Sequence, residues 1–254
     1  GHAADHHRRA AHYAALALFS VAILFRLIAA SNLNRVLWRL ASPERWPTYT
    51  MLCPLYREAE VLPDLISALR RLDYLGHALQ ILLLVEADDE LTLNAARIAA
   101  RNPNTETLII PPASPRTKPK ALNAGLARAR GEFLVVYDAE DRLYSQQLLA
   151  ALAEFHHGGE RLACLQAPLE IDNVPDSWIT RQFAAEYAIQ FREILPLLTR
   201  LKLPLPLGGS SNHFRTDVLR KVGGWDPFNV TEDADLGYRL AREGYASGVI
   251  GPPT

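Results

Sequence analysis

The stretch "LQILLLVEADDELTLNAARIAAR", residues 79–101, decides the fold because it joins an unbroken apolar run to a helical pattern. Residues 79–86 are almost wholly apolar, which is typical of a strand buried on both faces. Residues 89–101 place apolar side chains at the three- and four-residue spacing of an amphipathic helix. A strand–helix unit of this kind belongs to a parallel sheet that helices cover on both faces.

The same alternation continues on both sides of this unit. We therefore expect an α/β domain over residues 48–254, with a mostly parallel central sheet and helices on both faces. In such sheets ligands bind beyond the carboxyl ends of the strands. Further strands are predicted at residues 49–55, 106–112, 133–138 and 161–171, and further helices at residues 59–72, 119–130, 145–157, 177–195 and 216–222.

The composition is that of an ordinary globular protein with one large domain, because 49% of its 254 residues are hydrophobic and its formal net charge is −1. This near-neutral balance argues against nucleic-acid binding, which needs a basic face. Cys53 and Cys164 lie in apolar stretches, so we expect them to fill the core rather than form a disulfide, as suits a reducing compartment. Zinc-ligand spacings such as CxxC or HExxH do not occur.

The N-terminal segment, residues 1–47, contains a membrane-like stretch at residues 13–30, which is apolar apart from Ser20 and Arg26. Its length is at the short end for a membrane-spanning helix, and the alternative is a docking helix at the edge of the domain. The basic side chains near and after its end predict that the rest of the chain faces the cytoplasm, at the cell inner membrane. They are Arg26, Arg35, Arg39 and Arg45.

Polar side chains follow the first two predicted strands. Tyr56 and Glu58 come after the first, where Tyr56 is equally compatible with stacking on a base or sugar and with an ordinary half-buried aromatic. Glu86, Asp88 and Asp89 come after the second. These acids are typical of the first turn of a helix, but a carboxylate here also suits a donor on a nucleobase edge, such as a uracil imide.

After the third strand, positive charge gathers where a helix begins. Lys118 and Lys120 lie at the helix N-terminus, where the helix dipole disfavours cations, and Arg116 is close by. A bound anion would reverse this penalty, and helix N-termini bind phosphate. The pattern therefore predicts a phosphate site, with a solvated basic loop as the alternative.

The stretch "YDAED", residues 137–141, places three carboxylates at the end of the next strand. Asp138, Glu140 and Asp141 repel one another, and their hard oxygen ligands suit Mg²⁺ or Mn²⁺. The alternative is that Asp141 caps a helix beginning near Leu143, which accounts for one acid and not for three. The stretch predicts a divalent metal site.

The less regular second half adds two stretches. Residues 208–215, "GGSSNHFR", begin with two glycines, which allow another group to come close to the backbone, and polar side chains follow them. His213 alone is more typical of a structural histidine. Glu232, Asp233 and Asp235 begin a later helix, where acids are expected on structural grounds alone. Taken together, the stretches predict a base pocket, phosphate lysines, metal carboxylates and a separate acidic group.

This ordered series of motifs resembles family 2 glycosyltransferases of the GT-A fold, and among them the membrane-embedded, cellulose-synthase-like polysaccharide synthases. The resemblance covers residues 49–254. Each motif is weak alone, and the five in order are strong. They are "PLYREAE", "VEADDE", "TKPKALNAGLARARGEFLVVYDAED", "GGSSNHFR" and "TEDADLGYRLAREGY".

The resemblance implies an inverting transfer from a nucleotide-diphosphate sugar, usually a UDP-sugar, to a saccharide acceptor in exopolysaccharide synthesis. It implies that Asp233 is the general base and that Asp138 and Glu140 hold Mg²⁺ or Mn²⁺. Asp141 stands beside Glu140, so the second metal ligand stays open between them. The nucleotide site would use Tyr56, Glu58, Glu86, Asp88, Lys118 and Asp138.

The chain departs from the family's processive members, because their Gln-x-x-Arg-Trp motif and further membrane helices do not occur in residues 1–254. We expect the chain to be part of a longer protein, with further membrane or regulatory subunits as possible partners. One alternative is a silent module that binds nucleotide sugar or metal and regulates a membrane partner. Another is a sugar-phosphate nucleotidyltransferase, although the Gly-rich phosphate loop that such an enzyme needs is not found.

Overall fold

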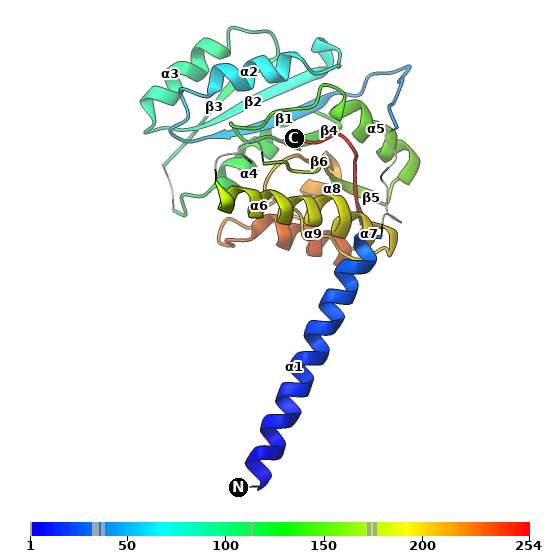
Figure 1. Ribbon diagram of the computed structural model, residues 1–254. Coiled ribbons are helices and arrows are strands. Elements are labelled where there is room, and N and C mark those ends of the chain that lie inside the picture. Colours follow the sequence, from blue (N-terminus) through cyan, green and yellow to red (C-terminus); the bar gives the residue numbers. More distant parts are fainter. Residues whose placement is uncertain (1, 32–35, 37–38, 113, 172–173, 175–176) are drawn as a thin grey trace.

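The computed structural model describes residues 2–31, 36, 39–112, 114–171, 174 and 177–254, so Arg35 lies outside the described residues. Within them, one sheet has the strand order β3-β2-β1-β4-β6-β5-β7 (Figure 1). The strands are β1 (Tyr49–Leu55), β2 (Leu79–Glu86), β3 (Thr105–Ile110), β4 (Phe133–Val136), β5 (Leu162–Gln166), β6 (Asn212–Arg215) and β7 (Ala246–Val249).

The sheet is mostly parallel, as the apolar runs predicted. β1 pairs in parallel with both β2 and β4, and β2 pairs in parallel with β3. β6 is the exception, because it runs antiparallel to β4 and β5. The carboxyl ends of β1, β2 and β4 therefore meet at one edge, and the segment that leads into β6 arrives at that same edge from elsewhere in the chain.

The helices cover both faces of the sheet. They are α1 (His2–Ala29), α2 (Leu62–Arg70), η1 (Gly76–Ala78), α3 (Glu90–Ala99), α4 (Lys118–Arg128), α5 (Gln147–Gly158), α6 (Trp178–Ile189), η2 (Gln190–Ile194), α7 (Leu195–Arg200), α8 (Thr216–Lys221) and α9 (Glu232–Arg242). α2, α3 and α5 contribute to one core cluster, and α4, α7, α8 and α9 contribute to the other.

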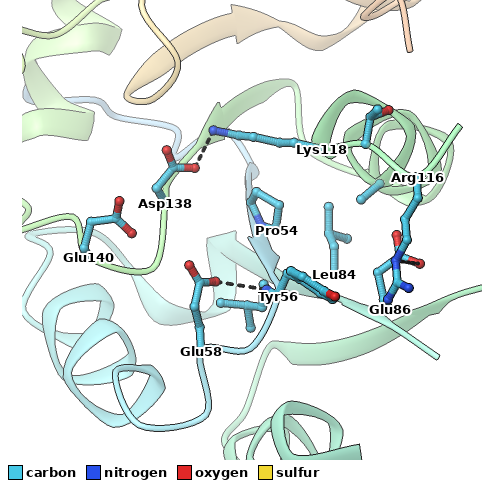
Figure 2. A pocket seen from close by; sticks show the side chains of 12 residues that line it. Pro54, Tyr56, Glu58, Leu84, Glu86, Arg116, Lys118, Asp138 and Glu140 are labelled. Carbon is cyan, nitrogen blue, oxygen red and sulfur yellow. Dashed lines mark hydrogen bonds and ion pairs between the residues drawn. The ribbon is translucent and has the colours of Figure 1, made fainter. Parts of the chain in front are cut away.

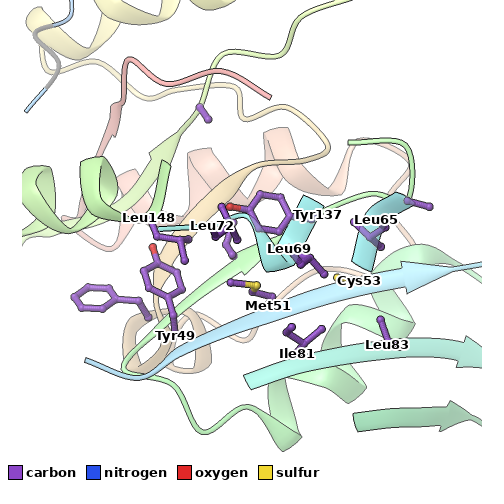
Figure 3. Packing of buried hydrophobic residues seen from close by; sticks show 14 of the residues in the cluster. Tyr49, Met51, Cys53, Leu65, Leu69, Leu72, Ile81, Leu83, Tyr137 and Leu148 are labelled. Carbon is purple, nitrogen blue, oxygen red and sulfur yellow. The ribbon is translucent and has the colours of Figure 1, made fainter. Parts of the chain in front are cut away.

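Alternate side chains of the central strands supply these two cores, as the two-residue period of a strand requires. In β1, Met51 and Cys53 face the cluster with α2, α3 and α5 (Figure 3), and Leu52 faces the opposite cluster. Cys53 and Cys164 are both free and buried, as expected. The double burial explains why the strands read as unbroken apolar runs.

The helix α1 extends away from the domain (Figure 1). Its residues His6–Ala29 are long and apolar enough to cross a membrane, judged by length and composition alone, and this window is not buried within the domain. At its carboxyl end α1 contacts η2, so the membrane-like helix adjoins the domain near α6 and α7.

The structure corrects two sequence-based expectations. The helix predicted to end before Pro196 instead continues through the π-helical turn η2 into α7, where Pro196 occupies the first turn and needs no N–H partner. The alternative in which Asp141 caps a helix near Leu143 is wrong, because α5 begins at Gln147. Gly223 and Gly224 follow α8 with φ of +86° and +67°, the left-handed conformation in which glycine commonly ends a helix.

Candidate active site

A cavity of about 410 Å³ opens at the carboxyl ends of β1, β2 and β4 (Figure 2). Asp88 and Asp233, which the sequence also singled out, do not line it. The cavity brings together six side chains that were predicted from four separate stretches of sequence: Tyr56, Glu58, Glu86, Lys118, Asp138 and Glu140.

The loop after β1 has a strained backbone that aims two side chains at the cavity. Arg57 has φ of +58°, a rare conformation for a residue with a side chain. Its N–H donates to Asp89 Oδ2 at 2.5 Å, and Asp89 also caps α3. Tyr56 N–H donates to Glu58 Oε2 at 3.0 Å, and the Tyr56 ring lies within 5.2 Å of the Arg57 guanidinium. Asp89 thus has the structural role expected of it and also fixes this loop.

The carboxylate of Glu86 is buried at the end of β2, and its Oε2 has no hydrogen-bond partner among the described residues. The nearest cations are Lys120 Nζ at 3.7 Å and Arg116 Nε at 3.9 Å. A buried acceptor without a hydrogen bond is costly unless a ligand completes it. Asp88 instead forms an exposed ion pair with Arg116, whose guanidinium lies 4.9 Å from the Tyr56 ring centre.

Lys118 connects three parts of the chain at the mouth of the cavity. Its Nζ donates to Asp138 Oδ1 at 2.5 Å and to the carbonyl oxygen of Gly209 at 2.6 Å. Lys118 begins α4, and its side chain extends from the helix to Asp138, where the ammonium group lies (Figure 2). This arrangement is suited to an anion that displaces or extends the contact with Asp138.

The three acids of "YDAED" have different surroundings. Asp138 and Glu140 line the cavity, whereas Asp141 Oδ2 accepts from Asp138 N–H at 2.8 Å and from the Ser210 hydroxyl. Burial raises the pKa of Asp138, with Lys118 opposing the shift and Glu140 adding to it. Burial also raises the pKa of Asp141, to about 7. Asp141 therefore fixes the loop, and Asp138 and Glu140 remain available to a ligand.

These donors fit a divalent cation. Within the described residues no three His, Cys, Asp or Glu side chains are grouped as a metal cage. Mg²⁺ sites commonly use one or two carboxylates and take their other ligands from water and substrate phosphates. Asp138 and Glu140 match that donor set. A cation between them would offset both the burial that raises the pKa of Asp138 and the repulsion from Glu140 that adds to it.

Asp233 is buried at the start of α9, and its carboxylate lies close to the same glycine, Gly209, as the Lys118 ammonium group. A Cβ atom placed on Gly209 would lie 3.6 Å from Asp233 Oδ2 and 3.9 Å from Lys118 Nζ. The Trp225 indole N–H donates to Asp233 Oδ1 at 3.0 Å. Burial raises the pKa of Asp233 to about 7, with Lys118 opposing the shift. Its second oxygen, Oδ2, lies near Gly209, and with a pKa of about 7 the carboxylate can take up a proton close to neutral pH.

Sequence reasoning missed the residues that hold Asp233 and Asp138. The backbone of Trp225 is clamped by Asn123 of α4, which accepts from Trp225 N–H at 3.0 Å and donates to its carbonyl oxygen at 2.6 Å. Ser210 joins the "GGSS" loop to Asp141. His213 is structural, as expected, because it is buried and hydrogen-bonded to Tyr49 at 2.8 Å. Asn123 and Trp225 lie in the stretches "ALN" and "GGW", which are far apart in the sequence. The turn at Gly224, with φ of +67°, lets the Trp225 backbone approach Asn123.

Comparison with known proteins identifies relatives of this chain. The profile of the protein family described as glycosyltransferase-like family 2 matches residues 47–249. A probable glycosyltransferase, YdaM, from Bacillus subtilis (strain 168) is 23% identical over 87% of this chain and 53% of its own length. A beta-monoglucosyldiacylglycerol synthase from Trichormus variabilis is 24% identical over 76% of this chain and 41% of its own. The chain thus spans about half the length of these curated relatives.

Solved structures share the fold. The mannosyltransferase PcManGT from Pyrobaculum calidifontis, in complex with GDP-Man and Mn²⁺, superposes with a TM-score of 0.72 at 21% identity. The match covers 93% of this chain and 64% of that one. S. aureus TarS 1-349 in complex with UDP-GlcNAc superposes with a TM-score of 0.57 at 17% identity, over 80% of this chain and 56% of that one. The mostly parallel sheet with its antiparallel β6 is thus a GT-A-like fold.

Proposed function

The chain belongs to glycosyltransferase-like family 2, and from that premise we propose that it is an inverting glycosyltransferase. It transfers a sugar from a nucleotide-diphosphate sugar to a saccharide acceptor. One observation carries the proposal: Glu86, Lys118, Asp138 and Glu140 line a single cavity, and Asp233 and Lys118 both lie close to Gly209 beside it. This arrangement supports the assignment of a base pocket, a diphosphate site and a proton acceptor in the order that the reaction needs.

The donor in this proposal is a UDP-sugar. The buried Glu86 acceptor suits the imide N–H of uracil, and the Tyr56 ring suits the nucleoside. Glu58 fixes the loop that carries Tyr56. Asp88 orders Arg116 at the edge of the cavity and does not line it. The solved relatives hold GDP-Man in one case and UDP-GlcNAc in another, which supports a nucleotide sugar as the donor class.

Asp138 and Glu140 are the proposed ligands of Mg²⁺ or Mn²⁺. A divalent cation there would neutralise charge on the donor diphosphate and on the departing nucleoside diphosphate. The Mn²⁺ in the PcManGT structure supports this choice. Lys118 lies next to Asp138 and supplies a further positive charge at the same phosphates. Asp141 keeps the loop in place through Ser210 and Asp138 N–H.

Asp233 is the proposed general base. The acceptor hydroxyl oxygen attacks the anomeric carbon, and the bond from that carbon to the diphosphate oxygen breaks with inversion. The hydroxyl proton moves to Asp233 Oδ2, while Trp225 holds Oδ1. The electron pair of the broken bond leaves on the nucleoside diphosphate, whose charge Lys118 stabilises.

The cellular setting is also part of the proposal. The helix candidate His6–Ala29 would anchor the chain at the inner membrane, with the catalytic domain in the cytoplasm. This setting suits a role in exopolysaccharide synthesis, with further membrane or regulatory subunits as partners. A catalytically silent nucleotide-sugar module and a sugar-phosphate nucleotidyltransferase remain the alternatives, and product analysis separates them from the proposal.

The full-length protein in detergent micelles tests the function directly. With Mn²⁺ present, we expect UDP to be released from UDP-glucose or UDP-N-acetylglucosamine, and less GDP to be released from GDP-mannose. Chelation of the metal should suppress release. Binding of the donor without release would favour the silent module, and pyrophosphate release from UTP and a sugar phosphate would favour the nucleotidyltransferase.

Lys118→Ala is expected to weaken binding of UDP much more than binding of uridine. Only UDP loses the charge-assisted contact to phosphate, which contributes roughly 1.5–3 kcal/mol. Calorimetry with both ligands measures the difference. Lys221→Ala, an exposed lysine on α8 that contacts Tyr245, is the matched control and should bind both ligands normally. Equal weakening of UDP and uridine by Lys118→Ala would contradict the assignment.

A further inference from the structure

A second cavity, of about 440 Å³, lies where α1 meets α6 and η2. We call it the α1–α6 groove. Arg26 of α1 lies in one wall, Tyr187 of α6 and Phe191 of η2 lie in another, and the chain from Pro206 to Gly208 closes it. Gly208 directly precedes Gly209, whose carbonyl oxygen accepts from Lys118. The groove therefore ends one residue from the site that holds Asp233 and Lys118.

The wall of the groove next to the site is a π-helical turn. In η2 the N–H of Leu195 donates to the carbonyl oxygen of Gln190, five residues earlier. Such turns are uncommon and occur frequently at functional sites. A Cβ atom on Gly208 would lie 2.9 Å from Phe191 Cζ, so a glycine is needed for the loop to pack against this turn. The groove wall and the catalytic loop are thus in direct contact.

The surroundings of the groove are apolar and exposed. No residue of α6 is buried. Ile179, Phe183 and Tyr187 follow one another at four-residue spacing along one face and are 60%, 53% and 37% exposed. On α1, Leu24 and Leu27 flank Arg26 and are also exposed. A hydrocarbon chain gains free energy when it packs against this apolar surface, whereas a water-soluble saccharide does not.

The charged side chains that line the groove indicate which class of lipid headgroup it can bind. Among the described residues that line it, the formal charges are one guanidinium, Arg26, and one carboxylate, Glu186. A lipid phosphate would require an excess of cations or an array of N–H donors. A neutral lipid with a hydroxyl headgroup requires neither. The lining therefore matches a neutral lipid better than a phosphate-linked one.

We propose that the acceptor is carried on a neutral, hydroxyl-bearing membrane lipid whose hydrocarbon lies in the α1–α6 groove. Its headgroup passes Gly208 and Gly209 and presents the hydroxyl to Asp233, which takes the proton as the glycosidic bond forms and the nucleoside diphosphate leaves. This inference rests on the proposed function and names its acceptor class. A saccharide acceptor fits the same groove when it is linked to such a lipid.

Photo-crosslinking of the full-length protein tests where the lipid lies. Diacylglycerol with a diazirine on one acyl chain is placed in phosphatidylcholine vesicles that carry the protein, and tryptic peptides are analysed after irradiation. Arg181, Arg192 and Arg200 bound two peptides that contain the groove wall, residues 182–192 and 193–200. We expect label on both, suppressed by excess unlabelled diacylglycerol. Label confined to α1 would overturn the proposal.

Transfer by a groove-filling variant provides the second test. Ile194, the last residue of η2, also lines the groove. Ile194→Trp should lower transfer to monoglucosyldiacylglycerol by at least about tenfold, the loss of roughly two buried methylene contacts. UDP release without acceptor should be unchanged. Ile98→Trp, at an exposed isoleucine on α3, is the matched control. Normal lipid transfer by Ile194→Trp would overturn the proposal, as would equal use of methyl glucoside or a preference for undecaprenyl phosphate by the wild type. Absence of UDP release in the wild type would instead refute the proposed function.

Discussion

Asp233→Asn is expected to lower sugar transfer by at least about 10²-fold and to leave UDP affinity within a few-fold of the wild type. The asparagine keeps the size of the side chain and its acceptor for the Trp225 indole N–H, but it cannot take a proton from the acceptor hydroxyl. Donor binding is assigned to residues that line the cavity, such as Lys118 and Asp138, which this substitution leaves unchanged. Transfer assays at saturating donor, together with calorimetry with UDP, separate the two effects.

The pH profile gives a readout that a merely structural role would not change. Burial raises the pKa of Asp233 to about 7, and the protonated acid cannot act as a base. Transfer by the wild type should therefore fall as the pH is lowered through about 7, and the residual activity of Asp233→Asn should lack this dependence.

Asp235→Asn is the matched control for Asp233→Asn. Asp235 lies in the same first turn of α9, but it forms an ion pair with Arg239. Its loss should cost only about 0.3–1 kcal/mol of stability, the usual effect of an acid near a helix N-terminus, with near-normal turnover. Near-normal transfer by Asp233→Asn as well would mean that Asp233 is not the general base and has only the structural role of an acid near a helix N-terminus.

The parallel half of the sheet was predictable because strands that are buried on both faces have largely apolar sequences. β1, β2 and β4 are largely apolar, and a polar side chain lies at or soon after the end of each. β6 and β7 were not predicted. Each has four residues, and polar or small side chains interrupt both. They are strands because their neighbours supply hydrogen bonds, which is tertiary context that a local pattern does not contain.

The candidate site was predictable in part for the same reason. The carboxyl ends of adjacent parallel strands must meet, so Glu86 and Asp138 were expected near one another. The clamp between Asn123 and Trp225 joins residues 102 positions apart, and no spacing rule indicates it. Likewise, Glu140 and Asp141 are adjacent acids of similar chemistry. The hydroxyl of Ser210, from a distant loop, determines which of them turns away from the cavity.

Asp138→Asn is expected to weaken Mn²⁺-dependent binding of UDP by about 10- to 100-fold, the usual scale for a lost charged contact, while the fold stays intact. The variant keeps the backbone N–H bond to Asp141, and its amide oxygen still accepts from Lys118. The variant therefore loses one negative charge at the cation and little packing. Calorimetry with UDP, with and without Mn²⁺, measures the metal-dependent part alone.

Comparison of the neighbouring acids makes this prediction specific. Glu140→Gln should also reduce the effect of Mn²⁺, because Glu140 lines the cavity with Asp138 (Figure 2). Asp64→Asn, in the first turn of α2 and outside the cavity, is the control and should bind UDP with the full Mn²⁺ effect. If Asp138→Asn keeps that full effect, the carboxylates of "YDAED" do not hold the cation. Their mutual repulsion would then be offset by contacts that the described residues already make, among them those with Lys118, with Ser210 and with the N–H of Asp138.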